Sequence, residues 1–123
     1  MTVKEAIERT DAMRPNPVPL SEKINRLCSV DRTVMSEIML RHEHAPDLSF
    51  DGYSEDSQGE TLLVPPPYDE LYIYALEALI YYTCGELTRY NNSLATMQSI
   101  YEAYRREYHR THMPLRSDIR YLQ

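Results

Sequence analysis

Hydrophobic residues recur at three- and four-residue steps in four parts of the chain, a spacing that places them on one face of an α-helix. The first helix is predicted to begin at Thr2, because Thr2 and Glu5 have the spacing of a capping box. The prolines at 15, 17 and 19 end it, since each disfavours helix in the residue before it. Its apolar face consists of Val3, Ala6, Ile7 and Thr10.

The second helix is predicted to run from Ser21, a favourable N-cap, to about Glu43. Asp31 interrupts its hydrophobic face at mid-length, which suggests a bend or a break near Val30. The other positions of this face follow the helical period: Ile24, Leu27, Cys28, Val34, Met35, Ile38 and Met39.

The third helix is predicted to begin at Pro67 or Tyr68, because proline is tolerated in the first turn of a helix. From residue 71 to residue 84 it is apolar nearly all round, which is typical of a central helix with neighbours on most sides. Gly85 is well placed to end it in the left-handed conformation.

The fourth helix is predicted to span about residues 86–109, and its hydrophobic face is aliphatic at first and rich in tyrosine later. We expect the first half to pack on the third helix and the second half to project toward a wetter surface. The third and fourth helices should form an antiparallel pair in which Leu79 and Leu94 are both buried. The face keeps heptad spacing throughout: Leu87, Tyr90, Leu94, Met97, Tyr101, Tyr104 and Tyr108.

The rest of the chain is an acidic loop (residues 44–67) and a C-terminal arm. Within the loop, residues 48–53 and 61–64 are predicted to form a short β-hairpin. Pro114 stops the last helix, and no apolar period follows it. The predicted fold class is therefore mainly α, a small antiparallel helical bundle at residues 1–110 with an extended arm at residues 111–123.

Charge is distributed unevenly along this chain, whose net charge is −6. No Lys or Arg occurs between His42 and Thr88, a stretch with ten acids, whereas the tail after Tyr104 is basic. The negative total argues against a general nucleic-acid binder, because phosphate contacts need clustered cations. Opposite charges at two ends allow copies to pair head to tail, or allow an acidic face and a basic arm to meet different neighbours.

The sequence contains no catalytic, phosphate-binding or cofactor motif, so we predict that the protein is not an enzyme. Glu77 is the one charge in the apolar run at residues 71–84, and it lies on an exposed stripe or pairs with a residue such as Arg89; a general acid or base is the alternative. The apolar run at residues 71–84 is too short to span a membrane, and no signal peptide is evident. A cytoplasmic protein is therefore expected.

The cysteines and histidines do not have the spacing of metal sites. Cys28 and Cys84 are predicted to be reduced, buried residues, since they are far apart and form no C-x-x-C motif. The histidine pairs at 42/44 and 109/112 are predicted to be surface residues, because neither pair has a third ligand beside it.

Tyrosine is the dominant aromatic residue, with eleven Tyr, one Phe and no Trp. Tyrosine and arginine are the favoured anchors of protein interfaces. We therefore predict that the end of the fourth helix and the arm form a partner interface, in which the arm gains order on binding. Its residues are Tyr101, Tyr104, Arg105, Tyr108, Arg110, Arg116, Ile119, Arg120, Tyr121 and Leu122.

Three stretches of the chain form a recognisable set. They are residues 2–7 followed by 14–16, residues 62–74 with the run Val-Pro-Pro-Pro-Tyr-Asp-Glu-Leu, and residues 90–93 followed by 108–114. In order and spacing this set resembles the head–tail adaptor (connector or head-completion) proteins of tailed phages and prophages. The resemblance spans most of the chain, although residues 44–60 and 115–123 fall outside it.

The resemblance implies a non-enzymatic helical protein without cofactor that forms a dodecameric ring below the portal, in the virion neck, after assembly in the host cytoplasm. Its partners would be the portal protein, neighbouring copies and the next neck or tail protein, with DNA passing through the lumen without specific binding. Because acids let DNA slide without sticking, part of the acidic loop is expected to face the lumen or the tail: Asp47, Asp51, Glu55, Asp56 and Glu60.

Two other functions stay open at this stage. A small oligomeric scaffolding or regulatory protein would form a discrete low oligomer and would have no affinity for a portal. A DNA-packaging subunit would bind DNA in a salt-dependent manner through the C-terminal arginines.

Overall fold

The computed structural model describes residues 1–41 and 51–112, and this part of the chain is mainly helical, as the hydrophobic pattern predicts. The arm predicted at residues 111–123 begins later than expected, because Thr111 is still part of α4 and His112 is its C-cap. The rest of the arm, from residue 113, lies outside the described residues, as do the histidines at 42 and 44 and the part of the acidic loop that contains Asp47. The helices are α1 (Val3–Met13), α2 (Leu20–Glu37), α3 (Glu70–Thr83) and α4 (Leu87–Thr111), with short 3-10 turns η1 (Met39–Arg41) and η2 (Glu55–Ser57).

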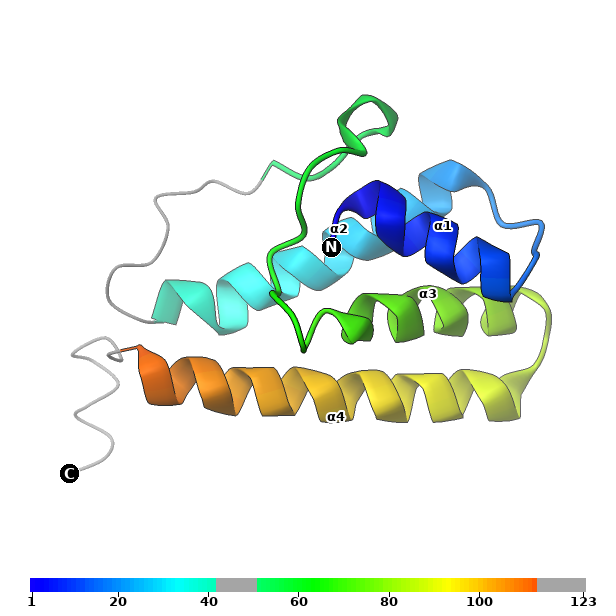
Figure 1. Cartoon of the computed structure of the whole chain (residues 1–123). Coiled ribbons are helices and arrows are strands. Elements are labelled where there is room, and N and C mark those ends of the chain that lie inside the picture. Colours follow the sequence, from blue (N-terminus) through cyan, green and yellow to red (C-terminus); the bar gives the residue numbers. More distant parts are fainter. Residues whose placement is uncertain (42–50, 113–123) are drawn as a thin grey trace.

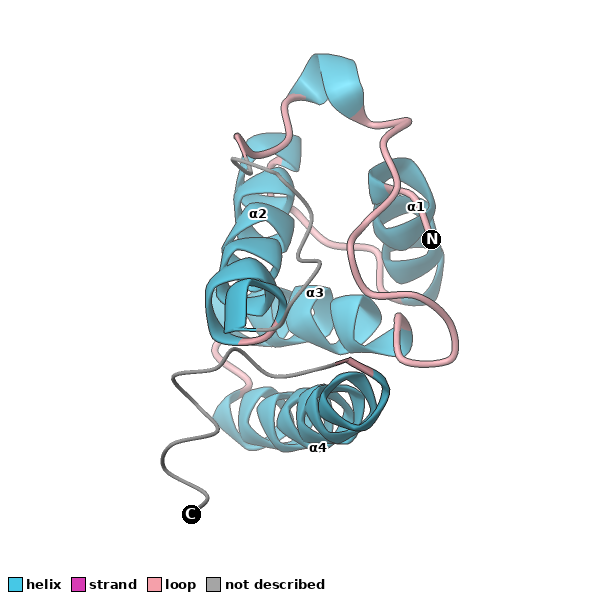
Figure 2. Cartoon of the chain, turned by 90° about the vertical axis from the view of Figure 1, so that its left-hand side faces the viewer, coloured by secondary structure: helices cyan, strands magenta, loops and turns pink. Residues whose placement is uncertain are grey.

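The helices form three layers with α3 in the middle. α4 runs antiparallel to α3 along one side, while α1 and α2 cover the opposite side of α3 (Figure 1). The chain between η2 and α3 passes over α1 and α2, so η2 projects away from α4 (Figure 2). The predicted antiparallel pair of α3 and α4 is confirmed.

α3 is buried on most sides, as its almost uniformly apolar sequence predicts. It begins at Glu70, slightly later than predicted, because Tyr68 N–H donates to the carbonyl of Pro65 and closes a turn before the helix. Gly85 ends it with a φ of 76°, which confirms the left-handed cap. Its buried residues are Leu71, Tyr72, Ile73, Ala75, Leu76, Ala78, Ile80 and Tyr81.

α1 begins where the sequence predicts. The Thr2 hydroxyl accepts a hydrogen bond from Glu5 N–H at 3.1 Å, so Thr2 is the N-cap. Another free N–H of the first turn, that of Val3, donates to the carbonyl of Glu60 at 3.0 Å. The second half of the acidic loop therefore supplies acceptors that the start of a helix lacks.

The predicted β-hairpin is wrong for the residues that the structure describes. Thr61 forms an isolated antiparallel bridge with Thr2, so it is paired with the N-terminus and not with residues 48–53. At the other side of the supposed hairpin, Tyr53 N–H donates to the sulfur of Cys28. Within the described residues, the backbone of Thr61 and Leu62 pairs with the N-terminus and that of Tyr53 bonds to α2.

α2 differs from the prediction at both ends. It begins at Leu20 with Pro19 as N-cap, and Ser21 lies inside the first turn instead of capping it. It ends at Glu37 and continues only as the 3-10 turn η1. The helix is uninterrupted at Asp31, so the predicted break is absent; the buried carboxylate finds hydrogen-bond donors on other elements.

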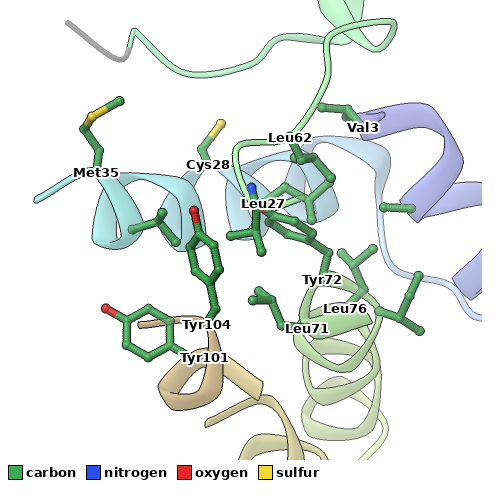
Figure 3. Close-up of a cluster of buried hydrophobic side chains, with 14 of the residues drawn as sticks. Val3, Leu27, Cys28, Met35, Leu62, Leu71, Tyr72, Leu76, Tyr101 and Tyr104 are labelled. Atoms are coloured by element: carbon green, nitrogen blue, oxygen red, sulfur yellow. The ribbon is translucent and has the colours of Figure 1, made fainter. Parts of the chain in front are cut away.

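α4 reverses the predicted burial. Tyr101, Tyr104 and Tyr108 are buried, whereas Leu94 and, on α3, Leu79 are only half-buried, so the expected wet tyrosine face and the expected burial of both leucines are wrong. α4 is longer than α3, and its tyrosine half reaches the end of α2 and the loop before α3 (Figures 1 and 3). The tyrosines share one hydrophobic cluster with the end of α2 and the residues just after it: Val34, Met35, Ile38 and Met39.

Candidate interaction surfaces

The acidic loop presents a set of exposed carboxylates on the side of the molecule opposite α4 (Figure 2). Among the described residues, these carboxylates form no ion pair with any cation of the same chain. The turn η2 that carries part of the set is closed by reciprocal bonds between the side chains and backbones of Ser54 and Ser57. The exposed acids are Asp51, Glu55, Asp56 and Glu60.

A buried carboxylate fixes this loop to the helices. Asp31, on α2, is fully buried and accepts hydrogen bonds from the hydroxyls of Tyr53 and Tyr72, the latter at 2.5 Å. It also accepts a bond from Leu63 N–H at 3.2 Å. The Tyr72 hydroxyl in turn accepts from Val64 N–H at 2.9 Å. We call this group the Asp31 clamp, because it joins α2, α3 and both ends of the described loop.

The protonation states within the Asp31 clamp follow from burial. Burial raises the pKa of Asp31 above its usual value, against the opposing effect of the hydrogen bonds it accepts. Burial and the neighbouring Asp31 also raise the pKa of Tyr53 and of Tyr72, so both hydroxyls keep their protons and remain donors. The side-chain hydrogen-bond donors to the buried Asp31 carboxyl are therefore tyrosine hydroxyls, whereas a buried carboxylate is more commonly paired with a cation.

The two cysteines differ in burial. Cys28 is buried beside the clamp, where its sulfur accepts Tyr53 N–H at 3.0 Å, as a small buried residue was predicted to pack. Cys84 is exposed, because it occupies the C-cap of α3 just before the turn at Gly85. The expectation of a buried Cys84 is therefore wrong, and both cysteines are free thiols.

The tyrosine half of α4 packs its rings against one another and against the loop before α3. The Tyr104 ring lies 5.6 Å from the Tyr68 ring and 5.9 Å from the Tyr108 ring, measured between centroids. His112 stacks on Tyr108 with 3.7 Å between ring centroids and is half-buried, whereas His109 is exposed. Burial raises the pKa of Tyr104 to about 12. Tyr101, Tyr104 and Tyr108 are thus largely covered by the chain itself, while the interface to which they were assigned stays a prediction.

The arginines of α4 remain on the surface. Arg105 and Arg106 are exposed, and Arg110 is exposed while its guanidinium binds the Glu107 carboxylate with contacts of 2.6 and 3.1 Å. The Glu107–Arg110 pair lowers the pKa of Glu107. The arm residues of the predicted interface, Arg116, Ile119, Arg120, Tyr121 and Leu122, lie outside the described residues.

A second basic site was not predicted from the sequence. Arg14, which follows α1, and Arg89, in the first turn of α4, both lie over the ring of Tyr81 on α3. They line a pocket of about 340 Å³ together with Glu77. Arg89 forms its ion pair with Glu86 at 3.5 Å, so the predicted pairing of Glu77 with Arg89 is not observed. We call this pocket the arginine cradle.

The described residues contain no group of three or more His, Cys, Asp or Glu side chains that could hold a metal ion. No helix among them is long and apolar enough to cross a membrane. Comparisons of the chain with protein-family models, with curated proteins and with solved structures found no match.

Proposed function

We propose that this protein is a structural adaptor that joins other protein surfaces, and that it acts as a head–tail connector of a tailed phage. In this role, copies of the chain form a ring that docks on the portal and joins the capsid to the tail, with no enzymatic step. The observation that best supports the proposal is the separation of exposed charge. The acids of residues 51–60 lie on one side of the helical core and the arginines of α4 lie on the other (Figures 1 and 2).

Two further features of the exposed charges favour a protein that binds partners. The acidic segment is held by the Asp31 clamp and by bonds to α1, so its carboxylates are positioned before any partner arrives. Pre-positioned groups lose less conformational freedom on binding, which makes a contact of modest area more effective. The exposed Arg105 and Arg106 offer planar guanidinium groups that pair with carboxylates through two bonds.

The decisive experiment mixes the purified protein with the portal protein of the genome that encodes it, followed by electron microscopy of the particles. We expect rings seated on the portal. The double substitution Arg105→Glu with Arg106→Glu should weaken attachment and leave the helical content unchanged, whereas Lys4→Glu, at an exposed position of α1, serves as the control. A discrete low oligomer without portal affinity would support the scaffolding function instead, and salt-dependent DNA binding would support the packaging function.

The C-terminal arm gives a second test of the same proposal. Deleting residues 115–123 is expected to leave the melting temperature nearly unchanged, because this segment has too few apolar residues to form a core of its own. Attachment to the portal or to a neighbouring copy should weaken. Full affinity of the truncated protein would leave the exposed arginines of α4 as the docking element.

A further inference from the structure

The arginine cradle is formed by residues that are distant in the sequence and are brought together at one end of the bundle. The guanidinium carbons of Arg14 and Arg89 lie 5.5 and 5.9 Å from the centre of the Tyr81 ring. This ring belongs to the buried core, so it holds both cations over a fixed surface. The remaining lining of the pocket is polar or aromatic: Tyr74, Glu77, Asn92, Ser93 and Thr96.

Two side chains of the cradle have hydrogen-bonding capacity that the chain does not use. Tyr81 is 5% exposed and Ser93 is 6% exposed, and both line the pocket. Within residues 1–41 and 51–112, neither hydroxyl has a hydrogen-bond partner. Both hydroxyls reach solvent through the pocket, so a ligand that accepts these bonds takes the place of water there. A carboxylate accepts them and also pairs with the two guanidinium groups.

Glu77 adds a requirement to the ligand. Its half-buried carboxylate lies in the same pocket and forms no ion pair within the described part of the chain. A ligand that is purely anionic would be repelled by Glu77, so the ligand must bring an N–H donor as well. A peptide segment with acidic side chains meets both conditions, because each residue offers a backbone N–H beside its carboxylate.

The chain itself carries such a segment. Residues 51–60 present four exposed carboxylates that have no cation within the described residues, on a backbone fixed by the Asp31 clamp. We infer that the arginine cradle binds this acidic segment of a second copy of the chain. The inference deepens the proposed function, on which it rests, by naming the contact between neighbouring copies. It places Asp51, Glu55, Asp56 and Glu60 at the contact between copies, whereas the sequence led us to expect them to face the lumen or the tail.

The two surfaces lie at different places on the molecule, which determines the kind of assembly. The acidic segment projects beyond α1 and α2, whereas the cradle lies at the end of the bundle where α1 ends and α4 begins (Figure 1). Such a contact is heterologous, because each copy uses one surface for one neighbour and the other surface for the next. Repetition of a heterologous contact gives a ring when the rotation closes and an open filament when it does not.

The test is sedimentation velocity of the full chain over a range of protein and salt concentrations. The wild-type protein should self-associate, and its association should weaken as salt increases. Arg14→Glu with Arg89→Glu should weaken it by at least about ten-fold, and Glu55→Arg with Asp56→Arg should do the same. A mixture of these two double variants is expected to associate in equal proportions, because each contact between unlike variants joins opposite charges, either the unchanged pair or the exchanged pair.

Controls separate this inference from the proposed function. Arg105→Glu with Arg106→Glu makes the same change of charge on α4 and should leave self-association unchanged while it weakens portal attachment. The neutral pair Arg14→Gln with Arg89→Gln provides a second cradle variant in case the reversed one unfolds. A wild-type chain that stays monomeric at every concentration, or cradle variants that associate as well as wild type, would overturn the inference. Portal binding by the same protein would then still support the adaptor function.

Discussion

Leu87 and Tyr104 occupy the same heptad face of α4, yet Leu87 is 60% exposed and Tyr104 is 4% exposed. On hydrophobicity alone the leucine half should be the more deeply buried of the two, because tyrosine carries a polar hydroxyl. The leucine half packs against α3 and meets no second layer there. The tyrosine half extends to the C-terminal part of α2 and to the segment that precedes α3 (Figure 3). The number of covering elements, and not the residue type, determines burial along this helix.

Two acids of α2 accept hydrogen bonds near the tyrosine end: Asp31 is fully buried and Glu37 is exposed. The Tyr101 hydroxyl donates to the Glu37 carboxylate at 2.5 Å, one helix turn or more beyond the Asp31 clamp. Acids on α2 thus satisfy hydroxyls that come from α3, α4 and the loop. The difference between the two ends of α4 is therefore chemical as well as geometric: one end is lightly covered and aliphatic, and the other is covered and held by hydroxyl–carboxylate bonds.

The largest expected difference between the two ends comes from truncating one residue of each. Tyr104→Ala should lower the free energy of unfolding by about 3–5 kcal/mol, because it removes a buried ring from the cluster. Leu87→Ala should change it by less than about 0.5 kcal/mol, as is usual for surface positions. Equilibrium denaturation in urea measures both. Equal losses would show that the two ends are buried alike.

Hydrogen bonding at the tyrosine end can be tested separately from packing. Tyr72→Phe keeps the ring but leaves Val64 N–H without its acceptor and removes one donor to Asp31, so we expect a loss of about 1–3 kcal/mol. Tyr74→Phe, on the same helix and only half-buried, is the matched control and should cost less than about 0.5 kcal/mol. Similar stability of the two variants would contradict the role of the Asp31 clamp.

The pH dependence of stability should show the Asp31 clamp directly. The pKa of Asp31 is raised in the folded state, so folding favours the neutral carboxyl. The stability of the wild type relative to Asp31→Asn should therefore increase as the pH falls through the raised pKa, and level off below the usual carboxyl pKa. Denaturation curves across the acid range measure this difference. A relative stability that decreases in acid would mean that the tyrosine bonds lower the pKa of Asp31 instead.

The smallest expected effects are at the aliphatic end. Leu79→Ala should cost about 1 kcal/mol, below the 2–5 kcal/mol typical of a buried leucine, because half-burial leaves less area to lose. Leu76→Ala, fully buried three residues earlier on α3, is the comparison and should fall in about the 2–5 kcal/mol range. A thermal melt in which Leu79→Ala destabilises as much as Leu76→Ala would show that the aliphatic end has a covering element.

Features that depend on neighbouring residues could be predicted from the sequence. The helical period located all four helices, the Thr2 hydroxyl capped α1, and Gly85 ended α3 with a positive φ. Each of these depends on steric and hydrogen-bonding requirements within a few residues. The start of α2 was missed by one residue because Pro19, two residues before Ser21, already supplies an extended N-cap.

Features that depend on distant residues were decided by tertiary structure. A lone Asp31 in an apolar face suggested a break in the helix, and only the folded chain brings Tyr53, Tyr72 and Leu63 N–H to its carboxylate. The arginine cradle likewise joins residues from three separate helices or their ends, and no local pattern marks it. The spacing of hydrophobic residues shows which face of a helix is apolar, because that spacing depends only on the geometry of the helix itself. Which part of that face is covered depends on the lengths and positions of the other elements, and these are fixed only when the layers pack.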